Sequence, residues 1–86
     1  IRSDATNPLY LLHKCQSLVL LKRFDEALRV IEAAVRLAPE GADCLNERAS
    51  VLIALGRRAE AGASIEKVLG KDPRNARAQA LQASLA

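Results

Sequence analysis

Residues 8–41 of this chain recur in altered form as residues 42–75, so the sequence carries an internal repeat of 34 residues. The two copies are identical at nine positions, and their terminal prolines, Pro39 and Pro73, lie one full period apart. A period of this length is typical of stacked helical repeats, each of which buries its apolar side against a neighbour. We therefore predict a helical solenoid, whose function resides in a surface rather than in an enclosed active site.

The composition of the chain agrees with packed helices. Half of the residues are apolar, and the chain has one Phe, one Tyr and no Trp, which favours a core of small and branched aliphatic side chains. A chain of 86 residues has room for one small domain and little room for a large cavity. The net charge of +3 is spread along the chain. Because there is no basic tract and no aromatic stacking platform, we expect no nucleic-acid partner.

Apolar runs and cysteines bear on the location of the protein. Apolar runs such as residues 18–21 are far shorter than the ~20 residues that cross a bilayer, so we expect no membrane partner. The chain has no Met and no signal peptide, and we interpret it as a fragment of a longer polypeptide that begins raggedly at residues 1–6. Cys15 and Cys44 are predicted to be reduced thiols, which favours a cytoplasmic location. The excess of Arg over Lys and the many alanines indicate a bacterial source.

Apolar residues recur every three or four positions in successive segments, which is the spacing of one face of a helix. The pattern predicts helices over residues 8–21 and 24–37 in the first repeat. It predicts a third helix that ends before Gly56, a fourth that ends near Gly70, and a fifth over residues 76–86. Because the connections are short, successive helices are expected to pack antiparallel.

The predicted fold class is all-α, an α-α superhelix of antiparallel helix-turn-helix repeats with five helices. One domain spans residues 1–86, with a first repeat over 8–41, a second over 42–75 and a capping helix over 76–86. Two helices approach to about 8 Å only where the side chains at their crossing are small. The small residues predicted at the crossings are Cys15, Ala49, Ala83, Ala27 and Ala61.

The period, the small residues and the terminal prolines together resemble the tetratricopeptide repeat family over residues 8–86. The residues that carry the resemblance are Leu11, Cys15, Leu18, Phe24, Ala27, Ile31, Ala34 and Pro39 in the first repeat, and Leu45, Ala49, Leu52, Gly56, Ala61, Ile65, Val68 and Pro73 in the second. The sequence departs from the family pattern at several positions. Leu11 and Leu45 replace the favoured Trp, Lys22 replaces a glycine, and Arg58 replaces an aromatic residue.

The resemblance implies a right-handed superhelix whose first helices line a concave groove that binds a peptide or a partner protein. The implied groove side chains are Leu9, Leu12, Gln16 and Val19 from the first helix, Asp43, Asn46, Ser50 and Ile53 from the third, and Arg77, Ala80 and Ser84 from the fifth. One end of this strip is apolar and the other is polar, which suits an extended or helical peptide held partly through its backbone.

Some members of the family grip the carboxylate tail of heat-shock chaperones through a clamp of Lys, Asn, Asn, Lys and Arg. The matching positions in this chain are Leu12, Gln16, Glu47, Arg77 and Leu81. Only Arg77 keeps a positive charge, and one Arg cannot balance several desolvated carboxylates. Glu47 would repel a carboxylate. The chaperone tail is therefore not an expected partner.

A few residues are candidates for chemistry of their own. Arg77 lies in the first turn of the fifth helix, where the helix dipole disfavours a cation, and it is either an acid-binding residue or a solvated surface arginine. His13 and Cys15 point about 200° apart on one helix and cannot act together. Cys44 is a candidate for an exposed, reactive thiol, although only the helix terminus would lower its pKa. No phosphate-binding, zinc-binding or nucleophile motif occurs, so we expect no catalytic residue, metal or cofactor.

These observations leave three interpretations of function open. The first is an interaction scaffold, not itself an enzyme, that docks a peptide or a protein in the groove. The second is a segment that positions substrate for a larger enzyme of which it forms part, such as a glycosyl- or sulfotransferase. The third is purely structural, with apolar Leu9, Leu12 and Val19 covered by an upstream repeat or by a second copy in a homo-oligomer.

Overall fold

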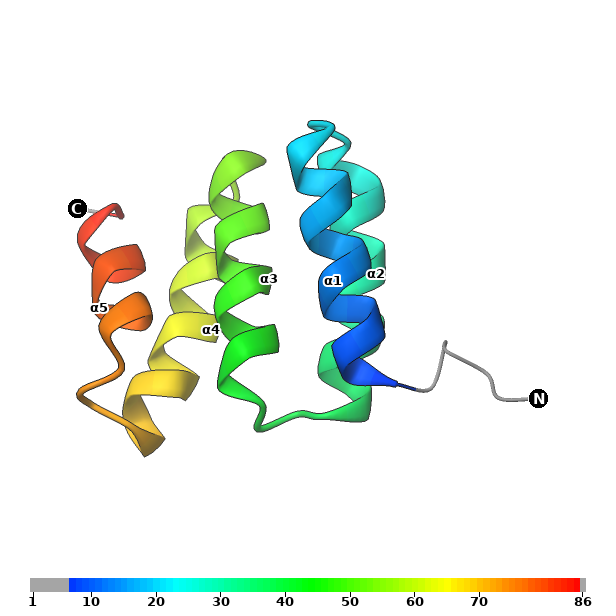
Figure 1. The fold of residues 1–86 in the computed structure, drawn as a ribbon. Coiled ribbons are helices and arrows are strands. Elements are labelled where there is room, and N and C mark those ends of the chain that lie inside the picture. Colours follow the sequence, from blue (N-terminus) through cyan, green and yellow to red (C-terminus); the bar gives the residue numbers. More distant parts are fainter. Residues whose placement is uncertain (1–6, 86) are drawn as a thin grey trace.

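The structure is a computed structural model that describes residues 7–85, and within them the chain forms five α-helices in two layers (Figure 1). The helices are α1 (Pro8–Leu20), α2 (Phe24–Leu37), α3 (Ala42–Ala54), α4 (Arg58–Lys71) and α5 (Ala76–Ala83). α1, α3 and α5 stand side by side in a front layer, and α2 and α4 pack behind them. The predicted all-α fold of antiparallel helix pairs is confirmed. The predicted ragged start at residues 1–6 lies outside the described residues.

Asparagine side chains start the first and last helices. Asn7 Oδ1 accepts a hydrogen bond from the Leu9 backbone N–H at 2.9 Å, and Asn75 Oδ1 accepts one from the Ala78 backbone N–H at the same distance. Each bond satisfies one of the N–H groups that have no partner inside the helix. The two asparagines thereby fix where α1 and α5 begin.

The starts of α2 and α4 have no side-chain cap, and each carries an Arg-Glu pair instead. Arg23 Nε donates to Glu26 Oε1 at 2.6 Å, and one period later Arg57 Nε donates to Glu60 Oε1 at 2.7 Å. Both glutamates lie in the first turn of their helix, where a negative charge is favourable. The pairs explain why the arginine and the glutamate are both repeated in sequence. The hydrogen bond from Arg57 also lowers the pKa of the Glu60 carboxyl.

The turn between the two helices of each repeat requires a left-handed residue. Gly56 adopts a φ of +79°, as expected of a glycine at the end of a helix, whereas Lys22 adopts a φ of +60° at the same point of the first repeat. A side chain in this conformation costs about 1–2 kcal/mol. The first hairpin is therefore closed by a more strained turn than the second.

The end of α5 differs from the prediction. The helix was expected to reach residue 86, which lies outside the described residues, but it already ends at Ala83. The backbone N–H of Ser84 bonds to the carbonyls of Ala80 and Leu81, and Ser84 Oγ donates to Leu81 O at 2.7 Å. The first bond continues the helical pattern, and the hydroxyl adds a side-chain donor to the Leu81 carbonyl at the end of the helix.

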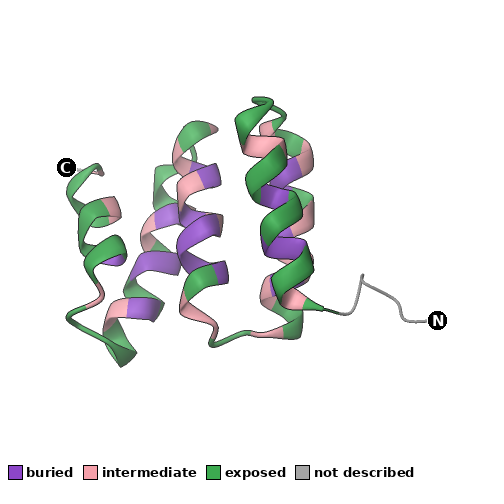
Figure 2. Ribbon diagram, viewed as in Figure 1, coloured by how far each residue is buried: buried purple, intermediate pink, exposed green. Residues whose placement is uncertain are grey.

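Four of the five small residues predicted at the helix crossings are buried. Cys15, Ala27, Ala49 and Ala61 are completely buried, and Figure 2 shows that the buried residues lie on the facing sides of the helices. Ala83 was predicted to occupy an equivalent crossing, but it is exposed. That prediction is wrong because, within residues 7–85, no second helix follows α5 to cross this face.

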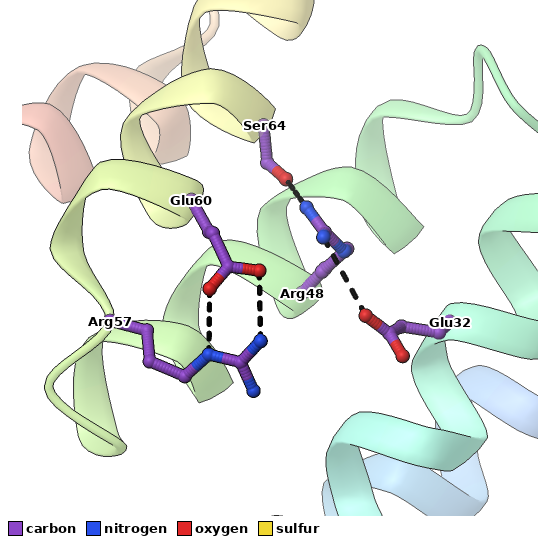
Figure 3. A network of polar contacts seen from close by, with 5 residues as sticks. All are labelled: Glu32, Arg48, Arg57, Glu60 and Ser64. Atoms are coloured by element: carbon purple, nitrogen blue, oxygen red, sulfur yellow. Dashed lines mark hydrogen bonds and ion pairs between the residues drawn. The ribbon is translucent and has the colours of Figure 1, made fainter.

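Arg48 of α3 contacts both α2 of the first repeat and α4 of the second, behind the front layer (Figure 3). Its guanidinium donates a hydrogen bond to Ser64 Oγ on α4 and lies 3.6 Å from a carboxylate oxygen of Glu32 on α2. The side chain is mostly buried, at 22% exposure. A rigid planar group thus links one helix of the first repeat to both helices of the second.

Candidate functional site

The nine residues predicted to bind a partner all belong to the front layer, but they differ in exposure. Leu9, Gln16, Asp43 and Arg77 are exposed, Val19, Ser50 and Ile53 are half-buried, and Leu12 and Asn46 are buried. Leu12 is therefore a core residue with one edge on the front face, and Asn46 is not a freely exposed amide. The face available to a partner is narrower than the sequence pattern indicated.

A hollow of about 270 Å³ lies between the start of α1 and the start of α3. It is lined by Leu9, Leu12, Gly41, Ala42, Asp43 and Cys44. Leu9 is a large apolar side chain with 57% of its surface exposed. The structure thus brings Leu9 and Leu12 together with Asp43, which lies 34 and 31 positions later in the sequence, in a pocket that is apolar except for one carboxylate.

Glu47 connects the three helices of the front layer. Its Oε1 accepts a hydrogen bond from Arg77 Nη2 at 3.0 Å and a longer one from Gln16 Nε2 at 3.4 Å. The Glu47 side chain is only 5% exposed, whereas that of Arg77 is 46% exposed. A carboxylate is held at this depth because the guanidinium and the amide replace the water that it loses.

This network corrects two sequence interpretations. Arg77 is exposed and also ion-paired, so it is neither a purely solvated arginine nor a cation fully available to an external acid. Glu47 was considered only as a group that repels carboxylates, and its role in joining α1, α3 and α5 was missed. A signal was present in the sequence, because Glu47 and Arg77 carry opposite charges at neighbouring positions of the family clamp.

Asn46 faces the start of α5. Its Nδ2 donates to Asn75 Oδ1 at 3.2 Å, the same oxygen that caps α5. Only 2% of Asn46 is exposed, and the Oδ1 atom of Asn46 itself has no hydrogen-bond partner among residues 7–85. A free buried acceptor of this kind costs about 1–3 kcal/mol. Asn46 therefore orients α5 more than it serves a ligand.

Two further hollows lie away from the front strip. One of about 180 Å³ is lined by Glu40, Ala42, Leu45, Lys67, Val68, Lys71 and Asp72, and the other of about 290 Å³ by Glu32, Val35, Arg36 and Arg48. The first is crossed by an ion pair between Glu40 and Lys71, whose hydrogen bond lowers the pKa of the Glu40 carboxyl. The second lies beside the Arg48 contacts described above. Each hollow thus has one charged pair within the chain at its edge, Glu40 with Lys71 at the first and Glu32 with Arg48 at the second.

Both cysteines are free and buried, which corrects the expectation of an exposed thiol at Cys44. Cys44 is 5% exposed because it lies under the start of α1, where it lines the front hollow. Burial, followed by the negative charges of Asp43 and Glu47, raises its pKa. Burial is also the main cause that raises the pKa of Cys15 from 9.0 to about 12. A raised pKa keeps both groups as unreactive thiols.

Alkylation of the folded chain with iodoacetamide at pH 8 is expected to be much slower than alkylation in urea, because neither thiol is exposed or ionised. Ser17→Cys is a matched control, since residue 17 is exposed on the same helix as Cys15, and its thiol should react at nearly the rate seen in urea. Mass spectrometry of the modified peptides gives the rate at each site. Fast labelling of Cys44 in native buffer would contradict its burial.

Stability is expected to fall in alkaline solution for the same reason. The folded chain holds the Cys15 proton up to a pKa of about 12, whereas the unfolded thiol loses it near 9.0. Between these two values the unfolded state binds fewer protons, so the free energy of unfolding falls by up to about 1.4 kcal/mol per pH unit. Urea unfolding of the Cys15→Ala variant isolates this contribution, because its free energy of unfolding should fall less as the pH rises.

The large exposed apolar side chains are unevenly distributed over the described part of the chain. The large apolar side chains that are exposed within the described range are Leu9, Tyr10, Leu20, Leu21 and Leu37, all in the first repeat. Of the three residues named for a structural interface, only Leu9 is exposed, since Leu12 is buried and Val19 half-buried.

In the part of the chain that the structure covers, no helix has the length and apolar character to cross a membrane. Nor do three His, Cys, Asp or Glu side chains gather there as metal ligands.

The comparison with known proteins agrees with this architecture. The family model for the tetratricopeptide repeat matches residues 18–85, which run from the end of α1 through α2, α3, α4 and α5. No curated protein sequence matches the chain. The match extends over most of the chain, and the paired helices, the small residues at their crossings and the 34-residue period all coincide with it. The chain therefore belongs to the tetratricopeptide repeat family.

Proposed function

We propose that this chain is a scaffold that docks a peptide, or a segment of a partner protein, across the front face of α1, α3 and α5. Tetratricopeptide repeats are non-catalytic helical repeats that generally mediate protein–protein interaction. The observation that supports a groove site is the hollow at the start of α1 and α3, where exposed Leu9 meets buried Leu12. Apolar pockets beside a few polar groups are the usual sites of peptide anchoring.

Polar groups beyond the hollow suit the backbone of a peptide. Gln16 and Arg77 are exposed on the same face and use only part of their hydrogen-bonding capacity on Glu47. An arginine has five N–H donors, so Arg77 retains donors for peptide carbonyls. Ser50, half-buried on α3, adds a hydroxyl that can donate or accept. An apolar anchor followed by backbone contacts is therefore the binding mode we expect.

A chaperone carboxylate tail does not fit this face. The Glu47 carboxylate of the chain itself already accepts from Arg77, the one cation kept at the clamp positions. A second carboxylate would compete with Glu47 for the same guanidinium and leave one charge unpaired, which is strongly unfavourable at low exposure. The partner is thus expected to be recognised by apolar and neutral polar groups at this point.

Peptides selected from a displayed library against the whole chain test the proposal. Leu9→Gln is expected to weaken their binding about fivefold, because roughly 1 kcal/mol of apolar burial in the hollow is lost. Leu21→Gln is the matched control, since Leu21 is also exposed but lies at the other end of α1, at 63% exposure. Calorimetric titration of the same peptides into the unchanged chain and into the two variants gives the affinities.

The comparison of the two variants decides the outcome. Loss of binding with Leu9→Gln alone supports the front hollow as the anchor site. Equal losses of affinity with both variants would indicate non-specific apolar binding to the first repeat. Unchanged affinity with Leu9→Gln would contradict the site. Circular dichroism spectra of the variants establish that each remains folded.

A further inference from the structure

The charge at the edge of the front hollow indicates which peptides it accepts. Of the six residues that line the hollow, Asp43 alone carries a formal charge. It is exposed and makes no ion pair with any residue between 7 and 85. Three positions earlier, across Gly41, the Glu40 carboxylate is already paired with Lys71. Asp43 is therefore the carboxylate at this edge that is left to an external partner.

The position of Asp43 within the repeat strengthens this assignment. Leu9, Asp43 and Arg77 occupy the same register position in α1, α3 and α5, each 34 residues after the last. The front layer thus presents an apolar, an acidic and a basic side chain in succession. Arg77 is partly neutralised by Glu47, so an apolar site followed by a negative site remains. The field of Asp43 acts inside the hollow, because it contributes to the raised pKa of Cys44.

We propose that the hollow between α1 and α3 binds a peptide segment in which a large apolar side chain stands next to lysine or arginine. The apolar side chain fills the hollow against Leu9 and Leu12, and the neighbouring cation pairs with Asp43. The hollow is large enough for this, since an apolar cavity of about 150 Å³ already holds a benzene ring. This inference rests on the proposed function and specifies its ligand.

Asp43 also has a role within its own helix, and the test has to separate the two. It lies in the first turn of α3, whose N-cap Gly41 provides no side-chain cap, so its charge favours the helix dipole. Asp25 holds the same position in the first turn of α2 and is likewise exposed. The start of α2 lies at the opposite end of the helix pair from the starts of α1 and α3, between which the hollow lies (Figure 1). Asp25→Asn therefore makes the same change of charge and helix dipole without touching the site.

The experiment uses acetylated and amidated peptides that contain one leucine flanked on both sides by lysine, by glutamine or by glutamate. Calorimetric titration into the whole chain is expected to rank lysine first, glutamine second and glutamate last. The net charge of +3 would by itself attract the glutamate peptide, so a preference for lysine reports the local site. Asp43→Asn is expected to reduce binding of the lysine peptide about two- to fivefold, the range of one exposed ion pair.

Further variants make each outcome decisive. Asp43→Lys is expected to reverse the ranking, whereas Asp25→Asn should leave it unchanged. Equal binding of the three peptides, with binding still lost on replacing their leucine by alanine, would overturn the charge preference and leave the proposed groove intact. Binding that depends neither on the peptide leucine nor on Leu9 would overturn the proposed function itself.

Discussion

Ala61→Phe is expected to lower the free energy of unfolding by about 1–3 kcal/mol, because the added ring has no space where α4 meets its neighbours. Ala61 is completely buried, as is Ala27 at the same position of the first repeat. At a closely packed crossing the helices have to separate or the ring has to leave its preferred rotamer. Each kcal/mol lowers the melting temperature of a domain of this size by about 4–8 °C. Thermal unfolding followed by circular dichroism measures the change.

Ala63→Phe is the matched control for this substitution. Ala63 lies on the same helix two residues later and is exposed, so a phenylalanine there should cost only about 0.5 kcal/mol of helix propensity. A large difference between the two variants supports close packing at Ala61. Equal melting temperatures would mean that the crossing has room for the ring and that the assigned packing is wrong.

Removal of residues 75–86 is expected to lower the free energy of unfolding by about 2–4 kcal/mol, from a total of about 4–13 kcal/mol for a chain of this length. The deletion removes the buried side chain of Ala78 and the partly buried Leu81 and Leu85. It also leaves the Glu47 carboxylate without Arg77. Because repeats depend on their neighbours for burial, removal of α5 also destabilises the preceding repeats. Urea unfolding of the two chains measures the difference.

Glu47→Gln separates the two causes of this loss. In the full chain the substitution removes the ion pair with Arg77 and should be destabilising. In the shortened chain, where the carboxylate has lost its main partner, the same substitution should be neutral or stabilising. Should the shortened chain unfold at the same urea concentration as the full chain, α5 would contribute nothing and the stacking would be refuted.

Features that repeat along the sequence could be predicted, and features formed between repeats could not. The helix limits followed from the apolar stripes and from Gly56, whose positive φ forms the turn after α3. The burial of Ala27 and Ala61, which lie one period apart, followed from their place in the repeat. Both kinds of signal are local or periodic, and a single sequence displays them directly.

The candidate site was predicted only in outline, because burial there depends on how neighbouring helices are placed. Cys44 and Asn46 are polar or reactive types near a helix start, yet one lies under α1 and the other faces Asn75. The pair between Glu47 and Arg77 joins helices whose residues are 30 positions apart. No spacing rule within one helix reveals such a contact. Only the register between successive front helices does.

The link that Arg48 makes between Glu32 and Ser64 has a consequence for the curvature of the array (Figure 3). The angle between successive hairpins sets the pitch of a helical-repeat solenoid, and a planar guanidinium held at both ends restrains that angle. The separation between the starts of α1 and α3, and hence the width of the opening between them, is thus governed from behind the front layer. A residue that does not line the front hollow thereby restrains its width.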